Sequence, residues 1–106
     1  MSEIIGRVRA AAGINLLFLP HAVRQMARPD RMITVEDVRN CVLHGEVIED
    51  YPEDVRGHSC LILGTEDPAR PIHVVCAPKD DYCAIITAYQ PDPKEWKMDW
   101  KTRRPL

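Results

Sequence analysis

The spacing of apolar residues changes once along the chain, at Gly45. Before this residue, apolar side chains recur every three or four positions, which predicts amphipathic helices over 3–12, 20–28 and 35–44. The third helix begins with the sequence of a capping box, in which Thr34 precedes the first turn and Asp37 follows three residues later. The first part of the chain is therefore predicted to be helical.

After Gly45 the apolar period becomes two, which is typical of β-strands. The alternation, with turn residues between the runs, predicts four strands over 46–51, 58–63, 72–77 and 82–89. The last two runs are apolar on both faces, so we expect them at the centre of the sheet. Residues 14–19, between the first two helices, are expected to form a short extended connection.

Helices followed by strands predict an α+β fold, with N-terminal helices packed on a four-stranded antiparallel sheet. The 106 residues suit a single domain, 1–106. After the last strand, the run Asp92-Pro93-Lys94-Glu95 has the residues of a helix start. We therefore expect a short C-terminal helix or tail that carries Trp96 and Trp100 on one side.

The net charge of −2 is unevenly distributed. Residues 1–31 contain five basic and two acidic side chains, residues 32–93 four basic and twelve acidic, and residues 94–106 five basic and two acidic. If both ends of the chain meet in the fold, a basic patch faces an acidic body and can attract phosphate groups. The alternative is that these charges belong to ordinary solvated surfaces.

The four cysteines are expected to be buried, reduced thiols, because each lies in an apolar run and no pair has the spacing C-x2-C. No cofactor or metal is expected, because few carboxylates lie near the histidines and no nucleotide-binding or zinc-protease motif is present. The longest apolar run, 14–19, is too short to cross a bilayer, and the chain does not begin like a signal peptide. We therefore expect a cytoplasmic protein without membrane contact.

Three side chains of the second helix fall on one narrow stripe: His21, Arg24 and Arg28. Two arginines beside a histidine in the first helical turn can hold a phosphate, because cations and free backbone N–H groups both attract anions. The stripe is predicted to bind phosphate, with His21 as an acid or base. An ordinary solvated helix surface is the alternative.

His73 lies in a predicted central strand, and Tyr89 ends the next strand. If the hairpin turns near Lys79, His73 lies across from Ile86 or Thr87 and within one or two residue pairs of Tyr89. His73 and Tyr89 are therefore candidate catalytic residues, and Thr87 is a candidate phosphate contact. The alternatives are a histidine bonded to backbone in the core and a tyrosine at the rim of the sheet.

The tail adds Arg103 and Arg104, which can fold back to stabilise negative charge on a phosphate. Trp96 and Trp100 are expected to dock the tail on the sheet, and the alternative is that they stack on nucleobases. A set of histidine, tyrosine and arginine side chains suits cleavage of a phosphodiester by the neighbouring 2′-hydroxyl, which requires a base, an acid and cations.

Several motifs between Phe18 and Arg104 together resemble the domain-of-unknown-function family 4258, which is similar to the RelE/ParE toxin superfamily. The matching pieces are His21-Ala22-x-Arg24-x-Met26, Ile33-Thr34-x-Glu36-Asp37-Val38, Gly45-Glu46-Val47-Ile48-Glu49-x-Tyr51-Pro52, Leu61-x-Leu63-Gly64, Pro71-Ile72-His73-Val74-Val75, Ile86-Thr87-Ala88-Tyr89-x-Pro91, and Trp96 followed by Arg103-Arg104. The family usually has arginine and then glycine before the Ile-Thr pair. Here that segment is two residues longer, so either Arg28 or Arg31 takes the arginine position.

The resemblance implies the toxin-like component of a bacterial toxin–antitoxin module. It implies a metal-independent endoribonuclease that takes RNA as its substrate and a zinc-finger antitoxin as its partner. Because the superfamily also contains members that bind without cutting, the alternative is a non-catalytic protein-binding module of the same fold. A metal-binding domain that uses His and Cys is a third hypothesis.

Overall fold

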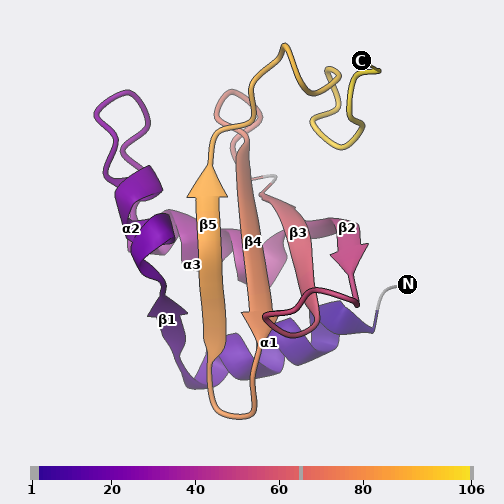
Figure 1. Cartoon of the computed structure of the whole chain (residues 1–106). Coiled ribbons are helices and arrows are strands. Elements are labelled where there is room, and N and C mark those ends of the chain that lie inside the picture. The colour runs from indigo at the N-terminus through magenta and orange to yellow at the C-terminus, as the bar shows by residue number, and fades with distance from the viewer. Residues whose placement is uncertain (1–2, 65, 106) are drawn as a thin grey trace.

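The computed structural model describes residues 3–64 and 66–105, which form three helices and one five-stranded sheet (Figure 1). The helices are α1 (Ile4–Ile14), α2 (Pro20–Met26) and α3 (Val35–His44), and the strands are β1 (Leu16–Phe18), β2 (Glu46–Tyr51), β3 (Ser59–Gly64), β4 (Ile72–Pro78) and β5 (Cys83–Tyr89). The α+β class, the three N-terminal helices and the four predicted strands are confirmed. None of the described helices has the length and apolar character that a bilayer span requires.

The prediction of a four-stranded, wholly antiparallel sheet is wrong, because residues 16–18 form a fifth strand. The strand order is β1-β5-β4-β3-β2, and β1 runs parallel to β5 while the other neighbours are antiparallel. Cys83 N–H donates to the carbonyl of Asn15 at 2.9 Å, and Leu19 N–H donates to the carbonyl of Ile85 at 3.0 Å. Residues 16–18 of the predicted connection 14–19 therefore belong to the sheet. Pairing with β5 satisfies backbone groups that would otherwise lie unpaired beside the core.

The helices cover one face of the sheet. In Figure 1, α1 and α3 lie behind the strands, and α2 stands beside β5. Alternation in β4 places Ile72, Val74 and Cys76 in the core against the helices, and it places His73 on the opposite face, which we call the open face.

The capping box that begins α3 is confirmed. The backbone N–H of Asp37 donates to the Thr34 hydroxyl oxygen at 3.0 Å, and the backbone N–H of Thr34 donates to the Asp37 carboxylate at 2.9 Å.

All four cysteines are buried and free, as predicted: Cys41, Cys60, Cys76 and Cys83. Cys60 and Cys76 pair directly across β3 and β4. Burial raises the pKa of Cys41 to about 12. Hydrogen bonds from the neighbouring thiols of Cys60 and Cys83, together with burial, raise the pKa of Cys76. The thiols of Cys41 and Cys76 therefore stay protonated at neutral pH and act as small apolar groups of the core.

The chain after β5 folds back over the open face, so of the predicted short helix or tail it is the tail that forms. Asp92 does start a single turn, in which its carboxylate accepts from Lys94 N–H at 2.8 Å and its carbonyl accepts from Trp96 N–H at 3.0 Å. The turn then ends, because Trp96 is 2% exposed and forms a β-bridge with Arg103. Burial of this indole against the sheet is worth more than continuation of a short exposed helix.

Two glycines give a matched test of this packing. A Cβ at Gly45 would lie 2.5 Å from the carbonyl oxygens of Cys41 and Leu63, both of them backbone atoms, whereas a Cβ at Gly13 would meet nothing within 4 Å. We expect Gly45→Ala to lower the free energy of unfolding by about 1–3 kcal/mol, and Gly13→Ala to raise it by roughly 0.5 kcal/mol because alanine favours the helix. Urea denaturation followed by circular dichroism measures both. Equal stability of the two variants would contradict the close approach at Gly45.

Candidate functional site

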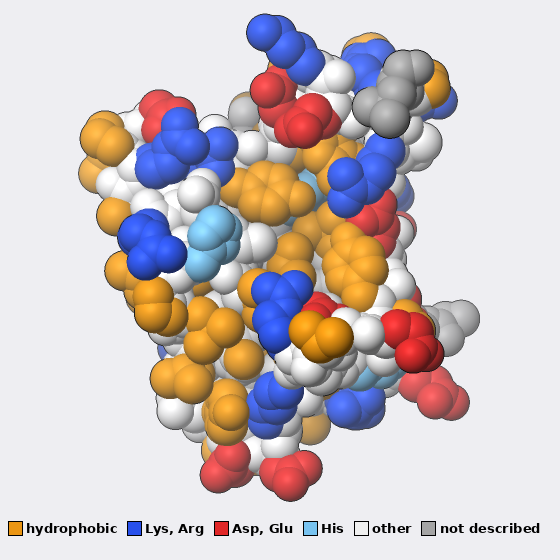
Figure 2. Space-filling model, viewed as in Figure 1, with side chains coloured by type: hydrophobic (Ala, Val, Ile, Leu, Met, Phe, Trp, Pro, Cys, Tyr) orange, Lys and Arg blue, Asp and Glu red, His pale blue; other side chains and the backbone are white. Residues whose placement is uncertain are grey.

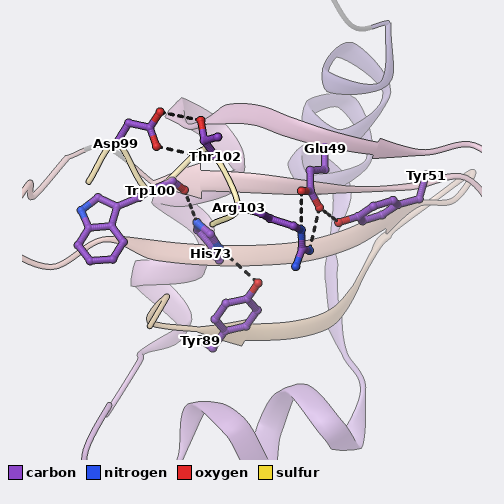
Figure 3. A network of polar contacts seen from close by, with 8 residues as sticks. All are labelled: Glu49, Tyr51, His73, Tyr89, Asp99, Trp100, Thr102 and Arg103. Atoms are coloured by element: carbon purple, nitrogen blue, oxygen red, sulfur yellow. Dashed lines mark hydrogen bonds and ion pairs between the residues drawn. The ribbon is translucent and has the colours of Figure 1, made fainter. Parts of the chain in front are cut away.

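His73 and Tyr89 lie directly opposite each other in the β4–β5 pairing. The expected partner of His73 was Ile86 or Thr87, with Tyr89 one or two residue pairs away. A register shift between Val75 and Cys76 accounts for one residue of the difference, because β5 accommodates Ile86 there. The rest arises because the hairpin turns later than expected, with Pro78 paired to Cys83. The ring nitrogen Nδ1 of His73 lies 3.2 Å from the Tyr89 hydroxyl. The two candidate catalytic side chains are thus in direct contact on the open face (Figure 3).

The tail completes the surroundings of His73. Its Nε2 lies 2.8 Å from the backbone carbonyl of Trp100, and its ring meets the Trp96 ring edge-on at a centroid distance of 4.5 Å. Because a carbonyl only accepts hydrogen bonds, Nε2 carries the proton. In the neutral ring Nδ1 is then an acceptor, and the Tyr89 hydroxyl donates to it.

The buried setting favours this neutral ring. His73 is 0% exposed, and burial lowers its pKa. The hydrogen bond to Trp100 and the charge of Glu49 act in the opposite direction and stabilise the protonated ring. His73 is therefore a neutral acceptor at pH 7, with groups already in place that stabilise the cation formed when it takes a proton.

A second group of side chains adjoins this pair: Glu49 and Tyr51 on β2, and Arg103 on the tail (Figure 3). The register of β2 shifts between Val47, which packs toward the core, and Glu49, which is thereby turned to the open face. Arg103 donates to both carboxylate oxygens of Glu49, from Nε at 2.8 Å and from Nη2 at 3.0 Å, and the Tyr51 hydroxyl also contacts this carboxylate. The guanidinium carbon lies 4.6 Å from the centre of the Trp96 ring.

These contacts set the charges of the group. The hydrogen bonds from Arg103 hold the pKa of Glu49 below its usual value, and the same carboxylate raises the pKa of Arg103. Burial, assisted by Glu49, raises the pKa of Tyr51 to about 12. Burial also raises the pKa of Tyr89, while the charges of Arg103 and Arg31 oppose that rise. The site therefore combines two neutral phenols, a neutral imidazole and an ion pair between the Glu49 carboxylate and the Arg103 guanidinium.

The charge of Arg31 acts on this site, and the charge of Arg28 is taken up by an ion pair elsewhere. The charge of Arg31 acts on the pKa of Tyr89, whereas the guanidinium of Arg28 pairs with Asp30 at 3.3 Å. The loop that carries Arg31 is fixed by Arg70, which donates to the carbonyls of Arg31 and Met32 at 2.9 Å each. Of the two arginines that the sequence left open for the family position, Arg31 is thus the one whose charge acts on Tyr89.

The other predicted residues are only partly brought together. His21 and Arg24 are exposed on α2, but this helix ends at Met26, so the prediction that Arg28 continues their stripe on a helix over 20–28 is wrong. Among the described residues, none of these three side chains makes a hydrogen bond or ion pair with His73. Arg104 donates to the carbonyls of Pro93 and Trp96, at 2.7 and 3.0 Å, and so braces the tail. Thr87 is half-buried in β5, two residues before Tyr89. In Figure 2, basic side chains gather over α2 on one side of the open face and over the tail on the other.

Sequence reasoning assigned no role to Glu49 and Tyr51, although both lie in a motif quoted above. Residues two apart in a strand share a face, so their proximity was predictable. Their pairing with Arg103, 54 residues away, was not. Among the described residues, no group of three or more His, Cys, Asp or Glu side chains is arranged to hold a metal ion.

The arrangement can support two kinds of chemistry. A phenol that donates to a buried neutral imidazole can pass a proton to it while taking one from a bound hydroxyl group. A guanidinium beside this pair can stabilise a developing negative charge, and its planar N–H groups suit phosphate.

The Glu49–Arg103 pair predicts a pH-dependent contribution to stability. Since folding lowers the pKa of Glu49, the contribution is full above the unfolded value of about 4.3 and is lost as the pH falls through the lower folded value. Arg103 is 60% exposed, so we expect Glu49→Gln to cost only about 0.5–1 kcal/mol at pH 7. Urea unfolding at pH 7, 5 and 3 should show that the difference in unfolding free energy between wild type and Glu49→Gln becomes smaller as the pH falls. Glu36→Gln, which removes an exposed pair with Arg39, is the control, and a Glu49 effect independent of pH would contradict the assignment.

The hydrogen bonds of His73 predict its tautomer. ¹⁵N NMR of the imidazole should show a protonated Nε2 and an unprotonated Nδ1 at pH 7. Because burial lowers the pKa, the titration midpoint should lie below 6.5. The variant Tyr89→Phe should keep the tautomer while shifting the Nδ1 resonance. A ring protonated at Nδ1 would show that Tyr89 does not donate to it.

Comparison with known proteins identifies the family of this chain. The model of the family described as "Domain of unknown function (DUF4258)" matches residues 18–90, from the end of β1 to just beyond β5. The matched region contains His73 and Tyr89 and stops before the tail. Comparison with curated proteins and with solved structures gives no match. Because the family model covers more than half of its residues, the chain belongs to the DUF4258 family.

Proposed function

We propose that the protein is a metal-independent endoribonuclease and the toxin-like component of a bacterial toxin–antitoxin module. The observation that carries this proposal is the contact between the Tyr89 hydroxyl and Nδ1 of the buried, neutral His73. In this contact His73 is the proton acceptor, and Tyr89 relays a proton to it from the open face. The charged guanidinium of Arg103 acts on Tyr89. A link to the RelE/ParE superfamily is part of the proposal.

The proposed reaction begins with the 2′-hydroxyl of a bound RNA next to Tyr89. The tyrosine takes the 2′-hydroxyl proton as its own proton passes to Nδ1 of His73. The 2′-oxygen forms a bond to phosphorus, and the bond from phosphorus to the 5′-oxygen breaks. The leaving oxygen takes a proton from His21, the candidate general acid, or from water. The products are a 2′,3′-cyclic phosphate and a 5′-hydroxyl, and His73 then returns its proton to solvent through Tyr89.

In this scheme Tyr89 is the catalytic residue that meets the substrate, and His73 acts through it. Glu49 and the Trp100 carbonyl stabilise the imidazolium that forms, since both raise the pKa of His73. Arg103 and Arg31 would stabilise the charge on the pentacoordinate phosphorus. Arg24 and Arg28 would hold flanking phosphates of the RNA, with Thr87 and Arg104 as further contacts. The basic side chains on both sides of the open face support this placement (Figure 2).

One observation favours a second candidate function, a non-catalytic protein-binding module. An apolar groove lies where β1, α2 and the start of α3 meet, lined by Phe18, Val23, Met26, Ala27, Ile33 and Val35. Val23 and Val35 are 52% and 47% exposed. Exposed apolar surface of this kind suits a protein partner. Under the first proposal that partner is the zinc-finger antitoxin, and under the second the groove is the functional site.

The substitution Tyr89→Phe tests the enzymatic proposal because it removes one oxygen atom. We expect it to lower the rate of RNA cleavage in EDTA by about 10²–10⁴-fold, the usual contribution of a general acid or base. Tyr82→Phe, in a half-buried tyrosine just before β5, is the matched control and should cut at the wild-type rate. The rate should also fall on the acid side as His73 becomes protonated, with a midpoint below pH 6.5.

Intact RNA after incubation with folded wild-type protein would overturn the enzymatic proposal. A growth assay separates the two candidate functions. If wild type and Tyr89→Phe inhibit growth equally while Val23→Asp abolishes inhibition, the binding module is favoured. If only Tyr89→Phe relieves inhibition, the nuclease is favoured.

A further inference from the structure

Trp100 has a strained backbone that no packing requirement of the core explains. Its φ angle is +61°, in the left-handed region that bulky side chains rarely adopt. Trp96 supplies the buried indole of the tail, whereas Trp100 is half-exposed. Glycine would fit this backbone without strain. A bulky residue held in such a conformation is a reason to look for a function of its side chain.

The strain is maintained by a closed set of hydrogen bonds. Trp100 N–H donates to the carbonyl of Lys97 at 2.9 Å, and Lys97 N–H donates to the carbonyl of Thr102 at 2.8 Å. The Asp99 carboxylate accepts from the N–H groups of Lys101 and Thr102, at 2.9 and 3.0 Å, and from the Thr102 hydroxyl at 2.8 Å. The carbonyl of Trp100 is engaged by His73. The turn therefore holds the backbone from which the indole of Trp100 extends.

Trp100 lines a groove between the tail and the loop that joins β3 to β4. The groove has a volume of about 290 Å³, and its lining includes Asp67, Pro68, Pro71, Met98, Trp100 and Lys101. Met98 is 88% exposed. In Figure 3 the indole of Trp100 points away from the network of His73, Arg103 and Glu49. The side chain is thus free of the polar network that its backbone completes.

We infer that this groove binds a nucleobase of single-stranded RNA, stacked on the indole of Trp100. The inference rests on the proposed function for its substrate, and it deepens that function by assigning a base subsite. An aromatic ring, two prolines and a thioether form the apolar, adaptable walls that a flat base requires. The groove, with a volume of about 290 Å³, has room for one base. A ribose and phosphate attached to that base would meet the tail, whose residues 94–106 carry five basic and two acidic side chains.

The position of the groove supports the same occupant. The carbonyl of Trp100 lies 2.8 Å from Nε2 of His73, whose other nitrogen accepts from Tyr89. The backbone of the residue on which a base would stack is therefore hydrogen-bonded to the proposed proton relay. Stacking is tolerant of sequence because every base has an aromatic face, and the carboxylate of Asp67 at the groove adds an acceptor for bases that bear an amino group.

The test compares two probes on two variants. The first probe is a short, fluorescein-labelled RNA whose sugars carry 2′-O-methyl groups, so that it cannot be cleaved by 2′-hydroxyl attack. The second has the same length and the same number of phosphates but no bases. By fluorescence anisotropy, wild type should bind the first probe more tightly than the abasic one, by about 5- to 150-fold if one base stacks. Intrinsic tryptophan fluorescence should be quenched by the first probe only.

Trp100→Gly is the decisive variant because it removes the ring and relieves the φ strain. We expect its thermal midpoint to equal or exceed that of wild type, while the preference for bases over the abasic probe disappears. Trp100→Phe should keep most of the preference. Val55→Ala, at a fully exposed apolar residue elsewhere, is the control and should change neither quantity.

Equal binding of both probes by wild type, or an unchanged preference in Trp100→Gly, would overturn the base subsite. Failure of the proposed function looks different. In that case RNA stays intact in the cleavage assay, but the preference for bases, and its loss in Trp100→Gly, remains. Cleavage that does not depend on Trp100, together with equal binding of both probes, would remove the subsite and leave the nuclease.

Discussion

A histidine buried in a sheet must have hydrogen-bond partners at both ring nitrogens, and the arrangement of this protein's open face depends on that constraint. In the neutral ring, one nitrogen needs an acceptor and the other a donor. The tail supplies the acceptor as the carbonyl of Trp100, and β5 supplies the donor as the hydroxyl of Tyr89. Trp96 then closes the ring off from solvent. Placement of the tail and register of the central hairpin are thus linked through one imidazole.

Arg103 joins this unit to the edge of the sheet. Its guanidinium binds Glu49 and stacks on Trp96, so the carboxylate that fixes the arginine also acts on His73 through its charge. A cation in this position stabilises the fold modestly, because it is largely exposed. That exposure leaves the guanidinium accessible to an anion from solvent. The stabilising role and the proposed chemical role of the residue are therefore compatible.

Patterns that extend over many residues predict the structure correctly. The period of three to four persists long enough to identify α1 and α3, and continuous apolar runs bounded by turn residues identify β4 and β5. Local signals failed where long-range packing was stronger. The capping residues at Asp92 predict a helix, but burial of Trp96 ends it after one turn, and the three residues of β1 are too few to show alternation.

In the candidate site, too, local spacing was predictable and long-range placement was not. Contact between His73 and Tyr89 could be approximated from alternation, but the register shift that makes it direct could not. Glu49 and Tyr51 share a strand face by spacing alone, yet only the fold reveals that Arg103 returns to them. His21 and Arg24 are exposed on α2, and Arg28 follows the end of this helix. The place of α2 beside β5 is a long-range feature that no local pattern encodes (Figure 1).

The parallel pairing of β1 with β5 has a consequence for how the chain folds. Leu16 pairs with Cys83, so the first strand made by the ribosome must wait for the last before it finds its partner. Until then α1 and α2 are joined by an unpaired extended segment with apolar side chains. Contacts so distant in sequence slow folding, because the loop between them must close before the contact stabilises anything. Sheet assembly is therefore expected to start at the β3–β4–β5 meander and to finish with the docking of the N-terminal third.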